Sequence, residues 1–519
     1  MALALLALSL ATGGAAECAR VAAAPSSVRV EYDSRTSAVG RMSALIFSAS
    51  SDGELRALDA DSGRVLWTFS APEALAATAY TDRMTDLAVL RFDANGDGVI
   101  DASGGDRVWL YFGLKRAGSY YYALDVSRRT PRILWTAGAS ALAGLAEAWS
   151  TPTVARVRIA GATQNGERFV IVVGGGFSRD SSAAGNHLFM LDAASGRLLW
   201  SAGPDSSNDL ALAHMTHGIA ARIATLDIDG DGFADRLYTA DIGGRVWRFD
   251  VWNGRARDRL VTGGMSASLG TAEPLPTSPA PSDARRFFTA PDVALMQPRG
   301  QNAWYNLAIG SGDGDDTRAT NVSNRFYSLR DHDPFVMRSQ GDYDATSPVL
   351  DADLTPITAG ALDVPDDSTG WKLDLASGEA VLAEPVTANG VLMFTTHVAG
   401  ASVDGSLCAS GDVNRVYAIR VETGAAALDL NDDAKITDAD RSAVLEQKGI
   451  PPAARIETPG PSAGAPTGPS LPATPGTPGT PPAGTPSRAP RCLVGAEILN
   501  QCVPLDTVLR TFWKRTSVD

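Results

Sequence analysis

Aspartate residues stand at alternate positions between Thr225 and Asp235, directly before a run of strand-forming residues. Carboxylates held so close repel one another unless a cation lies between them. Ca²⁺ takes about six to eight oxygen ligands, which a flexible loop supplies best from alternate residues. Gly230 and Gly232 allow the sharp turn that such a loop needs. The stretch therefore predicts a calcium site with these ligands: Asp227, Asp229, Asp231, the Phe233 carbonyl and Asp235.

Two further loops repeat the arrangement. In FDANGDGVID the predicted calcium ligands are Asp93, Asn95, Asp97, the Val99 carbonyl and Asp101. In DLNDDAKITDAD they fill positions 1, 3, 5, 7, 9 and 12 of an EF-hand-type loop, as Asp429, Asn431, Asp433, the Lys435 carbonyl, Thr437 and Asp440. This last loop has Asp where Glu is usual and no Gly at position 6, so it is expected to bind more weakly if Asp440 is monodentate. A helix is expected to follow it, over residues 438–448.

The remaining constellations point away from catalysis. His214 and His217 lie three apart without a third ligand or an adjacent Glu, so we interpret them as structural. The glycines at 174–176 precede a polar loop rather than a helix, which disfavours phosphate binding. The acidic cluster at 313–316 lacks alternation and is predicted to be a solvated turn. The sequence contains no nucleophile elbow, and we expect neither catalytic residues nor enzymatic activity.

A recurring hairpin pattern predicts an all-β fold. In LDADSGRVLW (58–67) and LDAASGRLLW (191–200) an apolar strand ends at Asp, a Ser-Gly turn follows, and a second strand runs to Trp. Looser copies end at Trp135 or begin at Trp247, Asn324, Trp371 and Val416. Such units predict a β-propeller of about seven blades over residues 40–450, with the calcium loops inserted and the tryptophans packed between blades. An open sandwich or two small β domains are the alternatives.

The composition limits where the protein can be located and which classes of partner it can bind. The net charge of −14 and the absence of a Lys/Arg cluster exclude a nucleic-acid footprint. Residues 1–16 combine an apolar run with small residues, like the later parts of a secretory signal peptide, so we expect export. Because no other apolar run reaches the roughly 18 residues of a membrane span, no transmembrane segment is expected.

The C-terminal part changes character at Pro451. Residues 451–490 are rich in Pro, Gly and Thr, which predicts a linker or disordered loop. Residues 491–519 regain apolar side chains and are expected to form a tail that docks on the propeller. Cys492 and Cys502 are close enough to form a short disulfide in an exported protein, whereas Cys18 and Cys408 have no assigned partner.

Several blocks, taken in order, resemble the C-terminal β-propeller of the PilC-type type IV pilus tip adhesins, a pilus biogenesis family. They are GDRVWLYFGLKRAGSYYYALDVS, AWSTPTVARV, VVGGGF with LDAASGRLLW, DIDGDGFADRLYTADIGGRVWRFDV, and IGSGD with NRFYSLRD. The resemblance covers roughly residues 58–423. It implies an exported protein at the pilus tip, the cell surface or the periplasmic side of the outer membrane. The family's calcium loop falls on residues 227–235.

The resemblance also implies a function and partners. Minor or major pilins, and host or surface receptors, are the expected partners. The calcium-bound propeller is expected to promote pilus extension or oppose retraction, and to support attachment and twitching motility. Family members are usually much longer, so the chain is expected to be a fragment, a truncated gene product or a minimal relative.

Two other functions remain as alternatives. The pattern at 57–67, in which blades of quinoprotein propellers dock on one another, suggests a quinoprotein-type dehydrogenase with a pyrroloquinoline quinone (PQQ)-like cofactor as one alternative. The chain lacks the adjacent Cys pair that many such enzymes carry. The loop at 429–440 raises a dockerin-like scaffold module, which normally uses two such loops where this chain has one.

Overall fold

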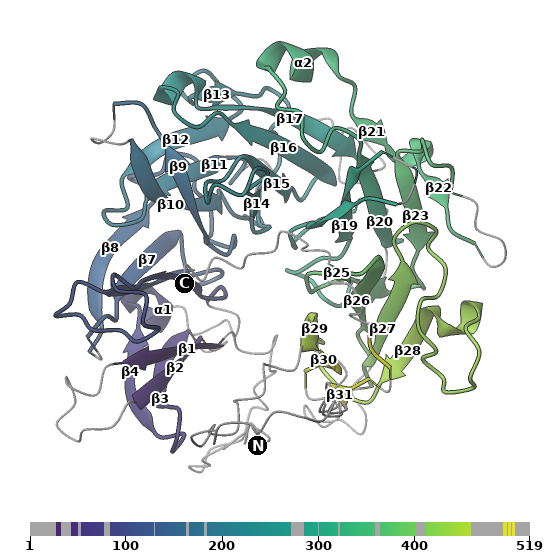
Figure 1. Ribbon diagram of the computed structural model, residues 1–519, viewed down its shortest axis with the longest axis horizontal. Coiled ribbons are helices and arrows are strands. Elements are labelled where there is room, and N and C mark those ends of the chain that lie inside the picture. Colours follow the sequence, from purple (N-terminus) through teal and green to yellow (C-terminus); the bar gives the residue numbers. More distant parts are fainter. Residues whose placement is uncertain are drawn as a thin grey trace, which may run out of the picture.

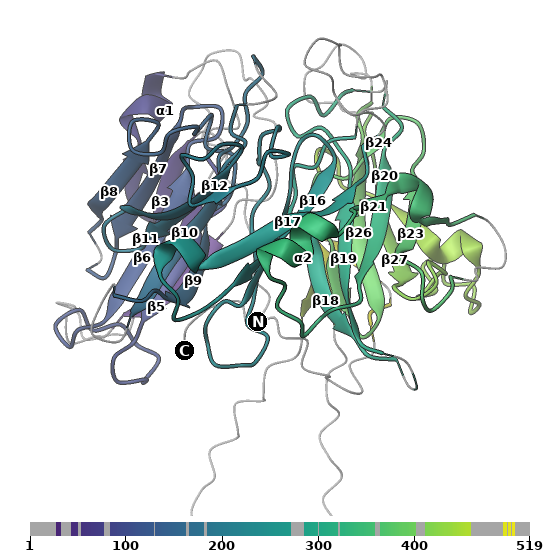
Figure 2. The ribbon, with the colours of Figure 1, turned by 90° about the horizontal axis from the view of Figure 1, so that it is seen from above.

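The protein is a ring of β-sheets around a common axis (Figure 1). The computed structural model describes residues 27–32, 43–49, 53–76, 84–128, 130–161, 166–180, 184–270, 285–298, 300, 302–319, 322–358, 364–400, 411–457, 491–495, 497–499 and 501–503. Within these ranges the strands form seven sheets, and Figure 2 shows the ring from the side. The predicted all-β propeller of about seven blades is confirmed.

The first four blades follow the chain. Blade 1 holds β1 (Ser27–Tyr32), β2 (Ser43–Ala49), β3 (Glu54–Asp59) and β4 (Val65–Ser70). Blade 2 holds β5 (Ala88–Phe92), β6 (Arg107–Gly113), β7 (Tyr120–Asp125) and β8 (Arg132–Gly138). Blade 3 holds β9 (Thr153–Arg158), β10 (Glu167–Gly174), β11 (Leu188–Asp192), β12 (Leu198–Gly203) and β13 (Leu210–Ala211). Blade 4 holds β14 (Ala224–Leu226), β15 (Arg236–Ala240), β16 (Arg245–Val251), β17 (Val261–Ser268) and β21 (Val349–Leu350).

The last three blades complete the ring. Blade 5 holds β18 (Asp292–Met296), β19 (Trp304–Gly310), β20 (Arg325–Asp331), β22 (Thr355–Pro356) and β23 (Gly370–Asp374). Blade 6 holds β24 (Glu379–Ala380), β25 (Val386–Ala388), β26 (Val391–Val398), β27 (Val413–Arg420) and β28 (Ser442–Leu445). Blade 7 holds β29 (Ala454–Glu457), β30 (Arg491–Val494) and β31 (Glu497–Ile498). The described helices are short: α1 (Pro72–Ala76), α2 (Gln340–Ala345) and the 3₁₀ turns η2 (Arg257–Arg259), η3 (Asp351–Asp353) and η4 (Asp438–Arg441).

The repeated hairpin turn has one geometry wherever the full pattern occurs. Asp59 accepts hydrogen bonds from the amide and hydroxyl of Ser62, both at 2.8 Å. Asp192 does the same with Ser195, at 2.9 and 2.7 Å. The glycine that follows each serine has φ +69°, a conformation that a side chain rarely adopts. Asp, Ser and Gly therefore encode the turn, and the apolar residues on either side encode the two strands.

Tryptophans join neighbouring blades, as predicted. The Trp135 indole of blade 2 donates to the Ala193 carbonyl of blade 3 at 2.9 Å. A Cβ added at Gly196 would meet the Trp135 ring at 2.6 Å, so only glycine admits the ring there. The Trp371 indole of blade 5 likewise donates to the Val421 carbonyl of blade 6 at 2.7 Å.

The hydrophobic core lies between the blades rather than within any one of them. Six clusters of buried side chains each join two consecutive sheets; the cluster between blades 3 and 4, for example, contains Val172, Trp200 and Phe249. A single blade cannot bury both of its faces, so stacking around an axis is the arrangement that removes them from water. No helix in the described ranges is long and apolar enough to cross a membrane.

The prediction of a helix at residues 438–448 is wrong. Only one 3₁₀ turn forms, at η4, and the chain then enters β28, which pairs with β27. Thr437 caps this turn and Asp440 completes a capping box. The edge of blade 6 supplies backbone partners for residues 442–445, and this pairing overrides a local helical preference.

The cluster at 313–316 is not a solvated turn. Asp315 accepts the guanidinium of Arg179 at 2.6 Å and lies 3.2 Å from that of Arg116. Its side chain is only 14% exposed. Asp313 pairs with Arg286 at 3.1 Å. The carboxylates lack alternation because they bind arginines rather than a common centre.

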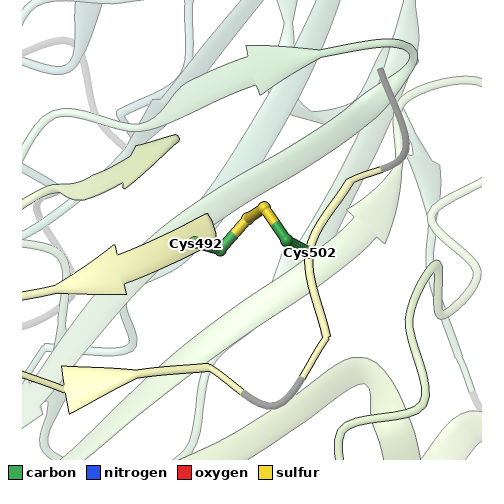
Figure 3. The surroundings of a disulfide bond; sticks show 2 residues. All are labelled: Cys492 and Cys502. Carbon is green, nitrogen blue, oxygen red and sulfur yellow. A yellow bond between two sulfur atoms is a disulfide. The ribbon is translucent and has the colours of Figure 1, made fainter. Parts of the chain in front are cut away.

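The C-terminal residues contribute to the ring. β29 begins at Ala454, inside the segment that composition assigned to a linker, and pairs with β30. Cys492 and Cys502 form the expected disulfide, which ties β30 to the chain beyond β31 (Figure 3). The proposed signal peptide at 1–16, Cys18 and Cys408 lie outside the described residues, as do residues 458–490.

Candidate metal centre

The three acidic loops lie on one face of the propeller. Residues 93–101 connect β5 to β6, and residues 227–235 connect β14 to β15, so both join the first strand of a blade to its second. Residues 429–440 connect β27 to β28, the third strand of blade 6 to its fourth. Successive strands of these blades are antiparallel, so both kinds of connection leave at the same end. We call this end the acidic-loop face.

The preceding blade supports the loop at 227–235. The Ala234 amide donates to the Arg156 carbonyl of β9 at 2.8 Å. The loop at 93–101 has the same support, because Ile100 forms a parallel bridge with Tyr32 of β1. Each loop is thus held against the end of the first strand of the blade before it.

Backbone amides of the loop at 227–235 donate hydrogen bonds to its own carboxylates and so stabilise the turn. Asp227 accepts from the amides of Gly230 and Gly232 at 2.7 and 2.8 Å. The later carboxylates repeat the pattern, since Asp229 accepts from the Asp231 amide at 3.1 Å and Asp231 from the Phe233 amide at 2.9 Å. The amides therefore hold the first, third and fifth side chains in a fixed order along the turn.

The loop at 93–101 shares this hydrogen-bond scheme, and the loop at 429–440 differs from it only in one donor to its first carboxylate. In the loop at 93–101 the bonds run to Asp93 from Gly96 and Gly98, to Asn95 from Asp97, and to Asp97 from Val99. In the loop at 429–440 they run to Asp429 from Asp433 and Ala434, to Asn431 from Asp433, and to Asp433 from Lys435. Three sequences with different residues at several positions thus fold into one type of turn.

Positions 4 and 6 of each loop require a left-handed backbone. The loop at 227–235 meets this with Gly230 (φ +81°) and Gly232 (φ +87°). The loop at 429–440 adopts the same conformation without glycine, at Asp432 (φ +59°) and Ala434 (φ +64°). Alanine pays a steric penalty in this region, so the third loop is strained where the other two are not.

Carboxylate oxygens converge in two of the three loops. Asp227, Asp229 and Asp235 each offer an oxygen within 4.8 Å of the others, and so do Asp429, Asp433 and Asp440. Burial, together with the charges of Asp229 and Asp227, raises the pKa of Asp235 above its ordinary value. A divalent cation would remove this repulsion, and an all-oxygen donor set suits calcium. The residues present therefore fit the ion that the sequence predicts.

Asp231 lies outside the convergent group. Its Oδ2 atom is 3.3 Å from the Nη1 atom of Arg158, the last residue of β9. Phe233, at the seventh position, has a buried ring that Arg158 and Arg156 cover at 3.7 and 4.5 Å from its centroid. Sequence spacing could not predict that a cation from blade 3 reaches the loop, because Arg158 and Asp231 are 73 residues apart in the chain.

The loop at 93–101 is arranged differently at its end. Asp101 accepts from the amide and hydroxyl of Ser103, at 2.9 and 2.5 Å. The buried carboxylate here belongs to Asp106, which accepts from the amides of Ala94 and Asp101 at 2.8 and 2.7 Å. Asp235 accepts from the Ile228 amide in the equivalent way, at 2.8 Å. Asp106 is a residue that sequence spacing missed, because an insertion places it beyond the regular ligand positions.

The loop at 429–440 is tied to the C-terminal segment. Asp440 is fully buried and accepts from the Thr437 amide at 2.8 Å and the Thr437 hydroxyl at 3.0 Å. The Asp429 amide donates to the Gln501 side chain at 3.1 Å. Gln501 directly precedes Cys502, so the disulfide fixes a residue that contacts the loop. Only the fold brings Gln501 to this place.

The histidines fit the structural role that spacing indicates. His217 is buried, and its Nδ1 atom lies 3.0 Å from the Thr216 hydroxyl and 3.3 Å from Arg245. Burial and the nearby Arg245 charge lower the pKa of His217 to about 4, so it is neutral at physiological pH.

Known proteins share this architecture. A family model described as outer membrane protein assembly factor BamB, a propeller family, matches residues 8–120. A type IV pilus biogenesis factor PilY1 homolog of Xylella fastidiosa is 28% identical over 298 residues, 51% of this chain and 18% of that protein. PilY1 of Pseudomonas aeruginosa is 24% identical over 468 residues, 80% of this chain and 38% of that protein.

A solved structure agrees with these relatives. The C-terminal domain of Pseudomonas aeruginosa PilY1 superposes with a TM-score of 0.57 at 18% identity, covering 88% of this chain and 92% of that one. In sequence the chain is similar to PilY1-type pilus proteins, and in fold it is similar to the PilY1 C-terminal domain. The resemblance to this family and its propeller is confirmed, although the chain spans 18% to 38% of the PilY1 relatives' own lengths.

Proposed function

We propose that this chain is the calcium-binding propeller of a type IV pilus biogenesis protein, exported to the pilus tip or the outer side of the envelope. The observation that carries the proposal is the convergence of Asp227, Asp229 and Asp235 within 4.8 Å. The convergence lies in a propeller whose relatives are PilY1-type pilus factors. In this proposal calcium occupies this loop and the loop at 429–440, and the loop at 93–101 binds it more weakly, because its carboxylates are engaged elsewhere.

Calcium supplies positive charge that turns the mutual repulsion of the carboxylates into attraction. Hydrogen bonds connect the loop to the rest of blade 4, so ordering of the loop also affects the neighbouring strands. The Asp235 carbonyl accepts from the Val251 amide at 2.7 Å, which links the end of the loop to the end of β16. Asn253 donates to the Ala234 carbonyl at 3.0 Å and so holds the loop from blade 4. Ordering of the carboxylates therefore stiffens the hairpin that follows.

The acidic-loop face is the proposed contact surface for a pilin or a surface receptor. All three loops point to this face, so calcium changes its charge and its rigidity together. A calcium-bound face that holds its partner would favour extension over retraction, with attachment and twitching motility as the outcomes in the cell. Calcium would then act as a switch on a binding surface.

The proposal is not catalytic, and the opposite face supports this. Near the axis, Arg116 of blade 2 pairs with Asp315 of blade 5, two blades that are not neighbours in the ring. Trp149, Phe177 and Phe288 pack edge-to-face beside this pair, with ring centroids 5.3 to 5.4 Å apart. Arg116 covers the Trp149 ring at 5.2 Å. Side chains from several blades thus contact one another on this face, and the proposal gives them a structural role.

Calorimetry after chelation tests the proposal. Calcium is titrated into the wild-type chain and into the Asp229→Asn, Asp231→Ala and Asp433→Ala variants. Asp205→Asn serves as the matched control, because Asp205 also accepts from a nearby serine in a turn but belongs to none of the loops. We expect wild-type binding at two or more sites, loss of one site in each loop variant, and no change in the control.

The proposal also predicts an effect in the cell. Pilus retraction and twitching are measured with the same variants expressed in place of the natural protein. Loss of calcium binding in Asp229→Asn should alter retraction, whereas Asp205→Asn should behave as wild type. Absence of calcium binding by the folded wild-type chain would refute the calcium site, and unaltered retraction in Asp229→Asn would refute the switch.

A further inference from the structure

Arg158 reaches the calcium loop from the neighbouring blade. Its backbone is clamped to blade 4, because its amide donates to the Asn253 side chain and its carbonyl accepts from the Gly254 amide, both at 2.8 Å. Its side chain extends over the Phe233 ring, 3.7 Å from the centroid, and ends 3.3 Å from the Asp231 carboxylate. The guanidinium is thus positioned at the loop by two independent contacts.

The two oxygens of Asp231 have different partners. Oδ1 accepts from the Phe233 amide at 2.9 Å, which belongs to the turn itself. Oδ2 faces Arg158, and Asp231 is the carboxylate that stands apart from the convergent group. A cation that recruits Asp231 competes with the guanidinium for this carboxylate, because both interact with it through the same negative charge.

We propose that Arg158 is an internal competitor of calcium at this loop and sets its affinity. The proposal rests on the calcium site proposed above and adds the residue that tunes it. When calcium binds, Asp231 turns toward the ion and the pair with Arg158 breaks. The stacking on Phe233 and the two backbone bonds of Arg158 do not involve Asp231, so the contact between blades 3 and 4 persists.

The ion pair between Arg158 and Asp231 can readily be replaced by a bond between Asp231 and calcium. The side chains of Arg158 and Asp231 are 40% and 36% exposed, so water screens their attraction and the pair opens at low cost. A guanidinium that stays near the loop also repels the incoming dication. Removing both effects should tighten calcium binding by roughly three- to tenfold, given the modest strength of exposed ion pairs.

The loop at 429–440 offers an internal comparison. Within the described ranges, no ion pair joins an arginine or lysine to Asp429, Asp433 or Asp440. The two loops share most of their hydrogen-bond scheme but differ in this cation. Substitution of Arg158 should therefore change the calcium affinity of the loop at 227–235 and leave that of the loop at 429–440 unchanged.

The experiment is a double-mutant cycle read by calcium calorimetry. Wild type, Arg158→Gln, Asp231→Asn and the double variant are titrated after chelation, with Asp433→Ala in all four to remove binding at the loop at 429–440. Asparagine keeps an oxygen at position 231, which lies outside the convergent group, so Asp231→Asn should weaken the site without abolishing it, unlike Asp231→Ala. Arg168→Gln is the matched control: it removes the same charge from the same blade, from an ion pair with Asp192 rather than with the loop. Arg158→Lys keeps the charge but loses the planar guanidinium, and should fall between wild type and Arg158→Gln.

The cycle gives distinct outcomes. The expected result is three- to tenfold tighter binding in Arg158→Gln, less than twofold change when the same substitution is made in Asp231→Asn, and no change in Arg168→Gln. Equal tightening in both backgrounds would overturn the competition, because the effect would then come from net charge alone. Unchanged affinity in both Arg158 variants, with a wild-type loop that binds calcium, would also overturn it. A wild-type loop that binds no calcium would instead refute the proposed site itself.

Discussion

Arg236 donates a hydrogen bond of 2.7 Å to Asp250, and both side chains are completely buried. Asp250 also accepts from Arg248, Tyr343 and the Arg338 amide, at 3.1, 2.8 and 2.8 Å. The guanidinium of Arg236 donates further to the carbonyls of Pro334 and Val336, at 2.9 and 2.6 Å. The segment after β20 contains Pro334, Val336, Arg338 and Tyr343. It carries α2 across to blade 4, where α2 lies beside β17 in both views (Figures 1 and 2). The charges therefore dock one blade's insertion onto its neighbour.

Asp250→Asn should be strongly destabilising. It would remove the negative charge between two buried guanidiniums, and an uncompensated buried charge costs about 3–5 kcal/mol. Denaturant unfolding should report a loss of this size. Asp258→Asn is the control, because Asp258 is 77% exposed and 3.9 Å from Arg259, and should change stability by less than about 0.5 kcal/mol. A loss below about 1 kcal/mol for Asp250→Asn would contradict the assigned role.

The sequence predicted the parts of this fold that are local. The Asp-Ser-Gly turns and the alternation of Asp in the loop at 227–235 depend on neighbours within a few residues, and both were recognised. What it missed was set by partners far along the chain. Arg158 meets Asp231 across 73 residues, and Gln501 meets Asp429 across 72. The edge of blade 6 likewise decided that residues 442–445 form a strand.

Position 6 of the loops gives a matched pair of substitutions. Ala434→Gly should stabilise the protein by up to about 1 kcal/mol, because alanine at φ +64° carries a steric cost that glycine lacks. Gly232→Ala, at φ +87° in the other loop, should destabilise by about 1–2 kcal/mol for the same reason. Thermal unfolding with a chelator present measures both, so that calcium does not contribute. Shifts of the same sign would show that the backbone conformation is not the cause.

The disulfide should support the loop at 429–440. Cys502→Ser releases the segment that carries Gln501, whose side chain accepts from the Asp429 amide. Closing a loop of this size is worth about 2–3 kcal/mol, which denaturant unfolding should detect as a loss. Calcium titration of Cys502→Ser should then report weaker binding at this loop and unchanged binding at 227–235. Gln501→Ala, which keeps the disulfide, separates the contact from the crosslink and should weaken binding without the loss of stability. Equal weakening at both loops in either variant would mean that the effect is global.

Asp292 should make stability depend on pH. The residue is 9% exposed at the start of β18, and burial, reinforced by the charge of Glu384, raises its pKa from 3.8 to about 7. A carboxyl whose pKa is raised in the folded state contributes stability that is fully present below about pH 4 and is lost as pH rises through about 7. Asparagine at this position does not titrate. The unfolding free energy of Asp292→Asn minus that of wild type should therefore increase between pH 4 and pH 8, measured with a chelator present so that the acidic loops bind no cation. Parallel curves across this range would contradict the prediction, because they would mean that Asp292 has the same pKa in the folded and the unfolded chain.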